Sequence, residues 1–138
     1  MLSEGAKDPA RLLVVDDEAD IVEYLCTALE DNGFAAAGVS DPALVPALVR
    51  QTKPDAILLD ILMPGQSGLA LYRTLRRDPA TAGIPVIIVT GVSRSESLQP
   101  EAGSLPPPDG YLEKPIAVPR LVEIVQSVIR RQGEDRHA

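Results

Sequence analysis

Three short, uninterrupted apolar runs constrain the fold of this chain more than any other feature. They are RLLVVDD (residues 11–17), DAILLD (55–60) and IPVIIVTG (84–91). Continuous rather than alternating apolarity is typical of strands that are buried on both faces of a parallel sheet. FAAAGV (34–39) and GYLEK (110–114) are weaker strand candidates. Because helical patterns lie between these runs, the sequence predicts an α/β domain.

Two of the intervening segments carry apolar residues at helical spacing. One stripe comprises Ile21, Val22, Leu25, Cys26 and Leu29 and stops at Asn32-Gly33, and the other comprises Val118, Leu121, Val122, Val125, Val128 and Ile129. A third candidate helix, residues 41–52, contains Pro46. Proline removes a hydrogen bond and clashes with the preceding turn, so we expect this helix to be kinked or to begin late. Cys26, the only cysteine, is expected to pack in the core.

The segment 93–109 does not fit the alternation of strands and helices. It has only two large apolar residues, Leu98 and Leu105, and four prolines, at 100 and 106–108. A full amphipathic helix is therefore not expected there. Residues 1–9 and 132–138 are polar and are expected to be flexible ends, which leaves one domain over residues 10–131. His137, the only histidine, lies in the C-terminal end and is a poor candidate for catalysis.

Composition excludes several classes of function. With 138 residues, 45% of them hydrophobic, the chain is long enough for a single domain with a substantial core. A net charge of -7 argues against a surface for nucleic acid or anionic membranes, because both require clustered Lys and Arg. There is no apolar run long enough to span a membrane and no secretory signal pattern, so we expect a cytoplasmic location.

Polar residues stand where the expected strands end: Asp16, Asp17, Asp60, Thr90 and Lys114. In an open parallel sheet the carboxyl ends of the strands meet at one edge, where ligands bind. Taken alone, Asp60 could cap the next helix or be an ordinary loop residue. Helix caps would not explain a lysine after one strand and paired aspartates after another. The five residues together therefore predict one shared site.

The charges of these residues indicate the chemistry of the site. Three neighbouring carboxylates repel one another, and one lysine cannot neutralise them, so a hard divalent cation is the natural partner. Mg²⁺ fits best, because it prefers oxygen ligands and often binds one or two carboxylates together with phosphate oxygens. A carboxylate can also act as a nucleophile and form an aspartyl phosphate. We therefore expect phosphoryl transfer with Asp60 as the acceptor.

The motifs VVDDE, LLDILMPGQSG, VIIVTG and YLEKP occur in this order. As an ordered set they resemble the receiver domains of two-component response regulators, of the single-domain, CheY-like type. The match covers about residues 10–131. The resemblance implies a flavodoxin-like fold, that is, a doubly wound five-stranded parallel sheet with strand order 2-1-3-4-5. Such domains usually have a fourth helix, which we expect here to be short or missing because of the prolines in residues 93–109.

The resemblance also implies the ligands of the cation. Asp60 would be the phosphoacceptor, Asp17 a direct Mg²⁺ ligand and Asp16 a ligand through water. The backbone carbonyl of Leu62 would complete the protein ligands.

Further roles follow from the same resemblance. Thr90 and Lys114 would bind the phosphoryl group, and the bond from Lys114 to Pro115 would be cis. Tyr111 matches the aromatic switch residue, whose ring moves inward when the threonine hydroxyl shifts towards phosphate. A tyrosine with only a core or surface role is the alternative.

The lifetime of the phosphoryl group is expected to be long. In receivers the residues two positions after the acceptor and two after the threonine flank the site, and here these are Leu62 and Val92. Both are apolar and cannot orient a hydrolytic water by hydrogen bonds. Gly91 would leave the phosphoryl group accessible. We therefore expect slow self-dephosphorylation, with the lifetime set mainly by a partner phosphatase or by back-transfer to the kinase.

The expected function is phosphorelay signalling rather than turnover of a substrate. The domain would take a phosphoryl group from the phosphohistidine of a sensor histidine kinase or a histidine phosphotransfer protein, and would assist that transfer. It would then change its binding to an unidentified output partner, without direct contact with nucleic acid or membrane. No output domain follows in the sequence, so we expect either a single-domain regulator or a piece of a longer protein.

Two alternatives remain open. A degenerate receiver would bind its partner without phosphorylation, although the complete set of five polar residues argues against this. A Mg²⁺-dependent phosphatase of the haloacid-dehalogenase type would also use an aspartate nucleophile. That class needs a second acid two residues after the nucleophile, where this chain has Leu62.

Overall fold

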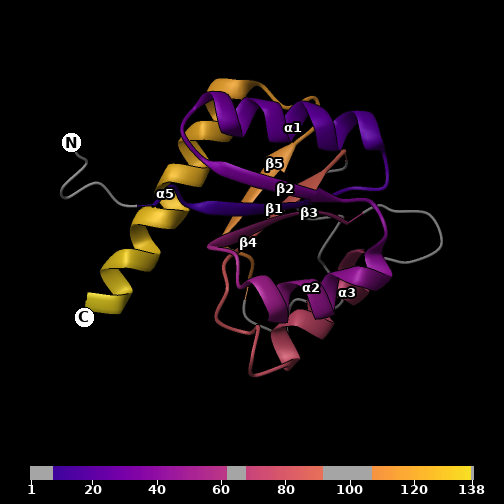
Figure 1. Ribbon diagram of the computed structural model, residues 1–138, viewed down its shortest axis with the longest axis vertical. Helices are drawn as coiled ribbons and strands as arrows, with labels where there is room; N and C mark the ends of the chain where they lie inside the picture. The colour runs from indigo at the N-terminus through magenta and orange to yellow at the C-terminus, as the bar shows by residue number, and fades with distance from the viewer. Residues whose placement is uncertain (1–7, 62–67, 92–106, 138) are drawn as a thin grey trace.

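A computed structural model describes residues 8–61, 68–91 and 107–137 of the chain. Its centre is one sheet of five parallel strands in the order β2-β1-β3-β4-β5 (Figure 1). The strands are β1 (Arg11–Val15), β2 (Ala35–Val39), β3 (Ala56–Asp60), β4 (Val86–Thr90) and β5 (Gly110–Glu113). The predicted sheet and strand order are therefore confirmed.

Helices cover both faces of the sheet. Those described are α1 (Ala19–Asp31), α2 (Val45–Thr52), α3 (Gly68–Arg77) and α5 (Val118–His137), with a short 3₁₀ turn at Pro42–Leu44. Helices α1 and α5 lie on one face, and α2 and α3 lie on the other (Figure 1). Most of residues 93–109, where we expected a short or missing helix, lies outside the described residues.

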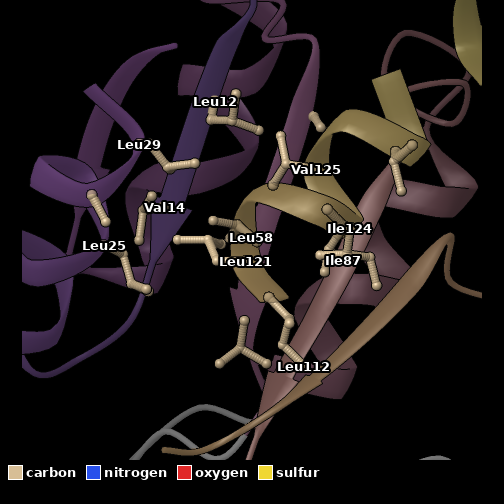
Figure 2. Close-up of a cluster of buried hydrophobic side chains, with 14 residues drawn as sticks. Leu12, Val14, Leu25, Leu29, Leu58, Ile87, Leu112, Leu121, Ile124 and Val125 are labelled. Carbon is tan, nitrogen blue, oxygen red and sulfur yellow. The ribbon is translucent and has the colours of Figure 1, made fainter. Parts of the chain in front are cut away.

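Burial of the central strands explains their continuous apolarity. Every residue of β3 and β4 is buried, because side chains of both orientations meet a helical layer. Leu58 and Ile87 face α1 and α5, where they pack with Leu25, Leu121 and Val125 (Figure 2). Their neighbours Ile57, Leu59 and Ile88 face α2 and α3 instead. The edge strand β2, by contrast, is only partly covered.

Three helix boundaries bear on the expectations from sequence. Helix α2 begins late, at Val45, so Pro46 lies in its first turn, where it removes no hydrogen bond within the helix. Helix α1 ends at Asp31, followed by Asn32 as the cap and by Gly33 with φ of 92°. Helix α5 continues to His137, so residues 132–137, which we expected to be a flexible end, are helical. Glycine in a helix costs about 1 kcal/mol relative to alanine, but α5 continues through Gly133.

Helix α3 was not assigned individually from the sequence. Its buried residues are Gly68, Leu71, Tyr72 and Leu75, which lie at helical spacing. This spacing is a readable signal, although charged residues surround it. Within the described ranges, no helix is both long and apolar enough to cross a membrane.

Candidate functional site

Three aspartates meet at the carboxyl edge of the sheet. Asp60 is the last residue of β3, and Asp16 directly follows β1. Because Val15 pairs with Leu59 in the parallel register of β1 and β3, the next residues, Asp16 and Asp60, come to lie side by side. Both are almost fully buried, at 1% and 3% exposure. One carboxylate oxygen from each of Asp16, Asp17 and Asp60 lies within 4.8 Å of the others.

Lys114 supplies the positive charge of this cluster. Its Nζ lies 3.1 Å from Asp16 Oδ2, 3.5 Å from Asp60 Oδ2 and 4.0 Å from Glu18 Oε1. Partial burial lowers the pKa of Lys114, but the carboxylates of Asp16 and Asp60 raise it, and the net pKa is above the ordinary value. Lys114 is therefore protonated at neutral pH. Its stabilising ion pairs are present there and are lost only when pH rises through that raised pKa.

The carboxylate of Asp16 is held in one orientation. Its Oδ1 accepts a hydrogen bond from the backbone N–H of Glu18 at 3.0 Å. Its Oδ2 is buried without a hydrogen bond, so its contact with Lys114 is an ion pair rather than an aligned hydrogen bond. An ion pair without an aligned hydrogen bond leaves lone pairs on this buried oxygen, and a metal ion would bind them. The three acids thus form an oxygen donor set that suits a hard cation such as Mg²⁺.

Thr90 and Tyr111 lie on neighbouring strands beside this cluster. Thr90 ends β4 and is 1% exposed, and its carbonyl accepts the Lys114 backbone N–H at 2.9 Å. Tyr111 on β5 is half-buried and packs against the core layer of α2 and α3. Since Thr90 pairs with Glu113, two residues after Tyr111, the side chains of Thr90 and Tyr111 share one face of the sheet. Both also line one hollow. The Lys114–Pro115 bond is cis.

The structure brings some of the expected site residues together and leaves others outside the described residues. Asp16, Asp17, Asp60, Thr90 and Lys114 come together, as the strand ends predicted. Gly91 follows β4 and is exposed, with nothing within 4 Å of the position of a Cβ. Leu62 and Val92 lie outside the described residues.

Two contacts at the site were missed from the sequence. Glu18 approaches Lys114, and its place directly after Asp16 and Asp17 was a usable signal. Tyr24 on α1 donates a hydrogen bond from its hydroxyl to the carbonyl of Ile116 at 3.0 Å. No pattern in the sequence pairs residues that are 92 positions apart.

Comparison with known proteins places this geometry in a family. The model of the response regulator receiver domain matches residues 12–126, which is most of the chain. The chain belongs to this family. It is therefore a receiver domain of the two-component response regulators. This confirms the resemblance seen in the motifs.

Curated relatives of the receiver domain are longer proteins. It is 38% identical to the phosphate regulon transcriptional regulatory protein PhoB of Pseudomonas aeruginosa, over 88% of this chain and 52% of PhoB. It is 33% identical to the DNA-binding response regulator MtrA of Mycobacterium tuberculosis, over 91% of this chain and 53% of MtrA. The receiver domain thus spans about half the length of these relatives.

Solved structures resemble the receiver domain over nearly their whole length. A sensor protein from Polaromonas sp. JS666 has a TM-score of 0.82 and 29% identity, with 89% of this chain and 98% of that chain covered. A CheY-like receiver domain from Methylobacillus flagellatus has a TM-score of 0.76 and 32% identity, with coverage of 87% and 98%. These similarities confirm the CheY-like fold.

Proposed function

We propose that this receiver domain accepts a phosphoryl group on Asp60 from the phosphohistidine of a histidine kinase or histidine phosphotransfer protein. The observation that carries this proposal is the Asp60 carboxylate, buried at the sheet edge 3.5 Å from the Lys114 ammonium and grouped with Asp16 and Asp17. An Asp60 oxygen forms the bond to phosphorus as the bond from phosphorus to the donor imidazole nitrogen breaks. That nitrogen takes up a proton.

The other residues of the site support this transfer through charge and position. Lys114 places a positive charge beside the acceptor oxygen, where negative charge accumulates on the phosphoryl oxygens. The hydroxyl of Thr90 would bind the same group, and Tyr111 on the same face would respond to its movement. When bound, Mg²⁺ supplies additional charge neutralisation to the phosphoryl oxygens. Asp16, Asp17 and Asp60 would hold it, with Leu62 contributing its backbone carbonyl.

The proposal includes the consequences of phosphorylation. The phosphoryl group is lost slowly, because the flanking residues Leu62 and Val92 are apolar, and its presence changes the binding of an output partner. The net charge of -7 supports a domain that does not itself contact nucleic acid. PhoB and MtrA are named for transcription and DNA binding, and this chain spans only about half of each. Output through DNA would therefore need a segment beyond this domain.

Phosphorylation can be tested with a small phosphodonor. We expect acetyl phosphate and Mg²⁺ to add the mass of one phosphoryl group to the wild type and to add nothing to Asp60→Asn. The matched control is Asp55→Asn. It makes the same change directly before β3, at the amino-terminal end of the strand that Asp60 ends. Intact mass spectrometry measures the adduct in each protein. Equal labelling of wild type and Asp60→Asn would show that another residue is the acceptor.

Cation binding gives a second prediction, which needs no phosphodonor. Mg²⁺ relieves the repulsion among three carboxylates, so it should raise the melting temperature by several degrees. A ligand at 100 times its Kd contributes about 2.7 kcal/mol of stability. Asp17→Ala should lose most of this gain, whereas Asp31→Ala, which removes an exposed acid at the end of α1, should keep it. Calorimetry with and without Mg²⁺ measures both. A wild type that melts at the same temperature in saturating Mg²⁺ has no such site.

A further inference from the structure

We infer that Tyr24 is a positioning residue for Lys114, and that it acts through the backbone of the loop that carries this lysine. The inference rests on the proposed function, which gives Lys114 its role beside Asp60. Tyr24 belongs to α1, which contributes none of the residues of the proposed site. It touches none of the three acids in the contacts described above.

The loop in question is residues 114–117, which joins β5 to α5. Hydrogen bonds from other elements hold it. At its start, the Lys114 backbone N–H donates to the carbonyl of Thr90 on β4 at 2.9 Å. Near its end, the hydroxyl of Tyr24 donates to the carbonyl of Ile116 at 3.0 Å. The Ala117 carbonyl in addition accepts the Leu121 N–H of α5 at 3.0 Å. The backbone that carries the Lys114 side chain is therefore restrained on both sides, and Tyr24 supplies the restraint from α1.

The surroundings of Tyr24 favour a role in positioning the loop over a role in packing the core. The side chain is 46% exposed, so it contributes less to the core than buried neighbours on α1 such as Leu25 and Leu29. Part of its ring lines a shallow, mostly apolar groove with Ile21, Leu25, Lys114, Pro115 and Ile116. The ring thus borders the same groove as the loop, while the hydroxyl binds the loop carbonyl of Ile116.

Precise placement of Lys114 matters because its ammonium serves two carboxylates at once. Its Nζ lies between Asp16 Oδ2 at 3.1 Å and Asp60 Oδ2 at 3.5 Å. The long lysine side chain is intrinsically mobile, and 24% of it is exposed here. A shift of the loop would change how the ammonium divides between these acids. A small misplacement of a group beside a reacting atom can reduce the rate strongly.

The test compares Tyr24→Phe with Thr27→Val, which removes one exposed hydroxyl from the same helix without touching the loop. The first readout is the side-chain NMR signal of Lys114 without Mg²⁺ or phosphodonor. Only Lys7, Lys53 and Lys114 occur in the chain, so the signal is readily assigned, and Lys53 is an internal reference. The second readout is the rate of adduct formation with acetyl phosphate, and the melting temperature checks folding.

We expect Tyr24→Phe to shift and broaden the Lys114 signal and to slow adduct formation up to about tenfold, the range for loss of one hydrogen bond. Lys53 and the Thr27→Val protein should show neither change. An unchanged Lys114 signal in Tyr24→Phe would overturn the inference, whatever the rate. If the wild type forms no adduct, the proposed function fails, and the Lys114 signal still decides the role of Tyr24.

Discussion

Gly68→Ala is expected to lower the free energy of unfolding by about 3 kcal/mol, although alanine is the better helix former by about 1 kcal/mol. Gly68 begins α3, and its N–H donates to the carbonyl of Ile61 at 3.1 Å. A Cβ there would come within 2.3 Å of the Asp60 carbonyl oxygen and of Ile61 Cα. These are backbone atoms, so the clash cannot be relieved by a side-chain rotation and outweighs the gain in helix propensity.

The same substitution is expected to reduce phosphorylation, because the backbone that must move carries Asp60. Gly83→Ala is the matched control, since nothing lies within 4 Å of its Cβ position. We expect that control to stay within about 0.5 kcal/mol of the wild type, as surface substitutions usually do. Urea denaturation measures both stabilities, and adduct formation measures the effect on the site. A Gly68→Ala protein as stable as Gly83→Ala would show that α3 can move away without cost.

Arg76→Met is expected to cost about 2–3 kcal/mol, far more than removal of a surface arginine. The Arg76 side chain is only 6% exposed and lies over the ring of Tyr72, 5.1 Å from its centroid. Its guanidinium donates to the Tyr72 hydroxyl, the carbonyls of Ala82 and Ile84, and the Asp109 carboxylate. Methionine would fill some of the space but would leave these acceptors without their donor, and partners left unpaired in this way dominate the cost.

Arg50→Met is the control for Arg76→Met. Arg50 is half-exposed and makes a 3.2 Å ion pair with Asp78, so its loss should cost less than about 1 kcal/mol. Adding Asp109→Asn to Arg76→Met should cost less than Asp109→Asn costs alone, because both residues belong to one network. Chemical denaturation of the single and double variants gives this coupling. Strict additivity would show that Arg76 and Asp109 stabilise the fold independently.

The sheet could be predicted because strands that are buried on both faces require continuous runs of apolar residues. Residues 57–59 and 86–89 are apolar without interruption, and the structure buries all of them between two helical layers. The late start of α2 followed from the fixed geometry of Pro46. The end of α5 could not be predicted in this way. Weak helix formers and polar residues make fraying of a helix end more common, but they do not fix the residue at which the helix ends. Helix α3 was overlooked because Arg73, Arg76 and Arg77 obscure its apolar stripe.

The acidic site could be predicted because its residues stand at strand ends, and topology brings strand ends together. Asp16, Asp60 and Lys114 needed no knowledge of side-chain packing beyond that rule. The contacts of Arg76 and Tyr24 are different. A charged residue buried in a core and an exposed tyrosine look like ordinary surface residues in sequence, and their partners are 33 and 92 positions away. Only the three-dimensional arrangement shows them.

The acidic site also depends on completion of the chain. Asp16, Asp60, Thr90 and Lys114 come from or directly follow four different strands, and each strand pair is parallel. Parallel neighbours require long crossover connections, so these contacts are non-local and form late compared with helices. A chain synthesised only as far as β4 contains Asp60 but not Lys114, and a chain folded only that far has not yet brought Lys114 beside Asp60. The site is thus complete only in the finished topology. Under the proposed function, truncated or half-folded copies would lack the ammonium beside the phosphoacceptor.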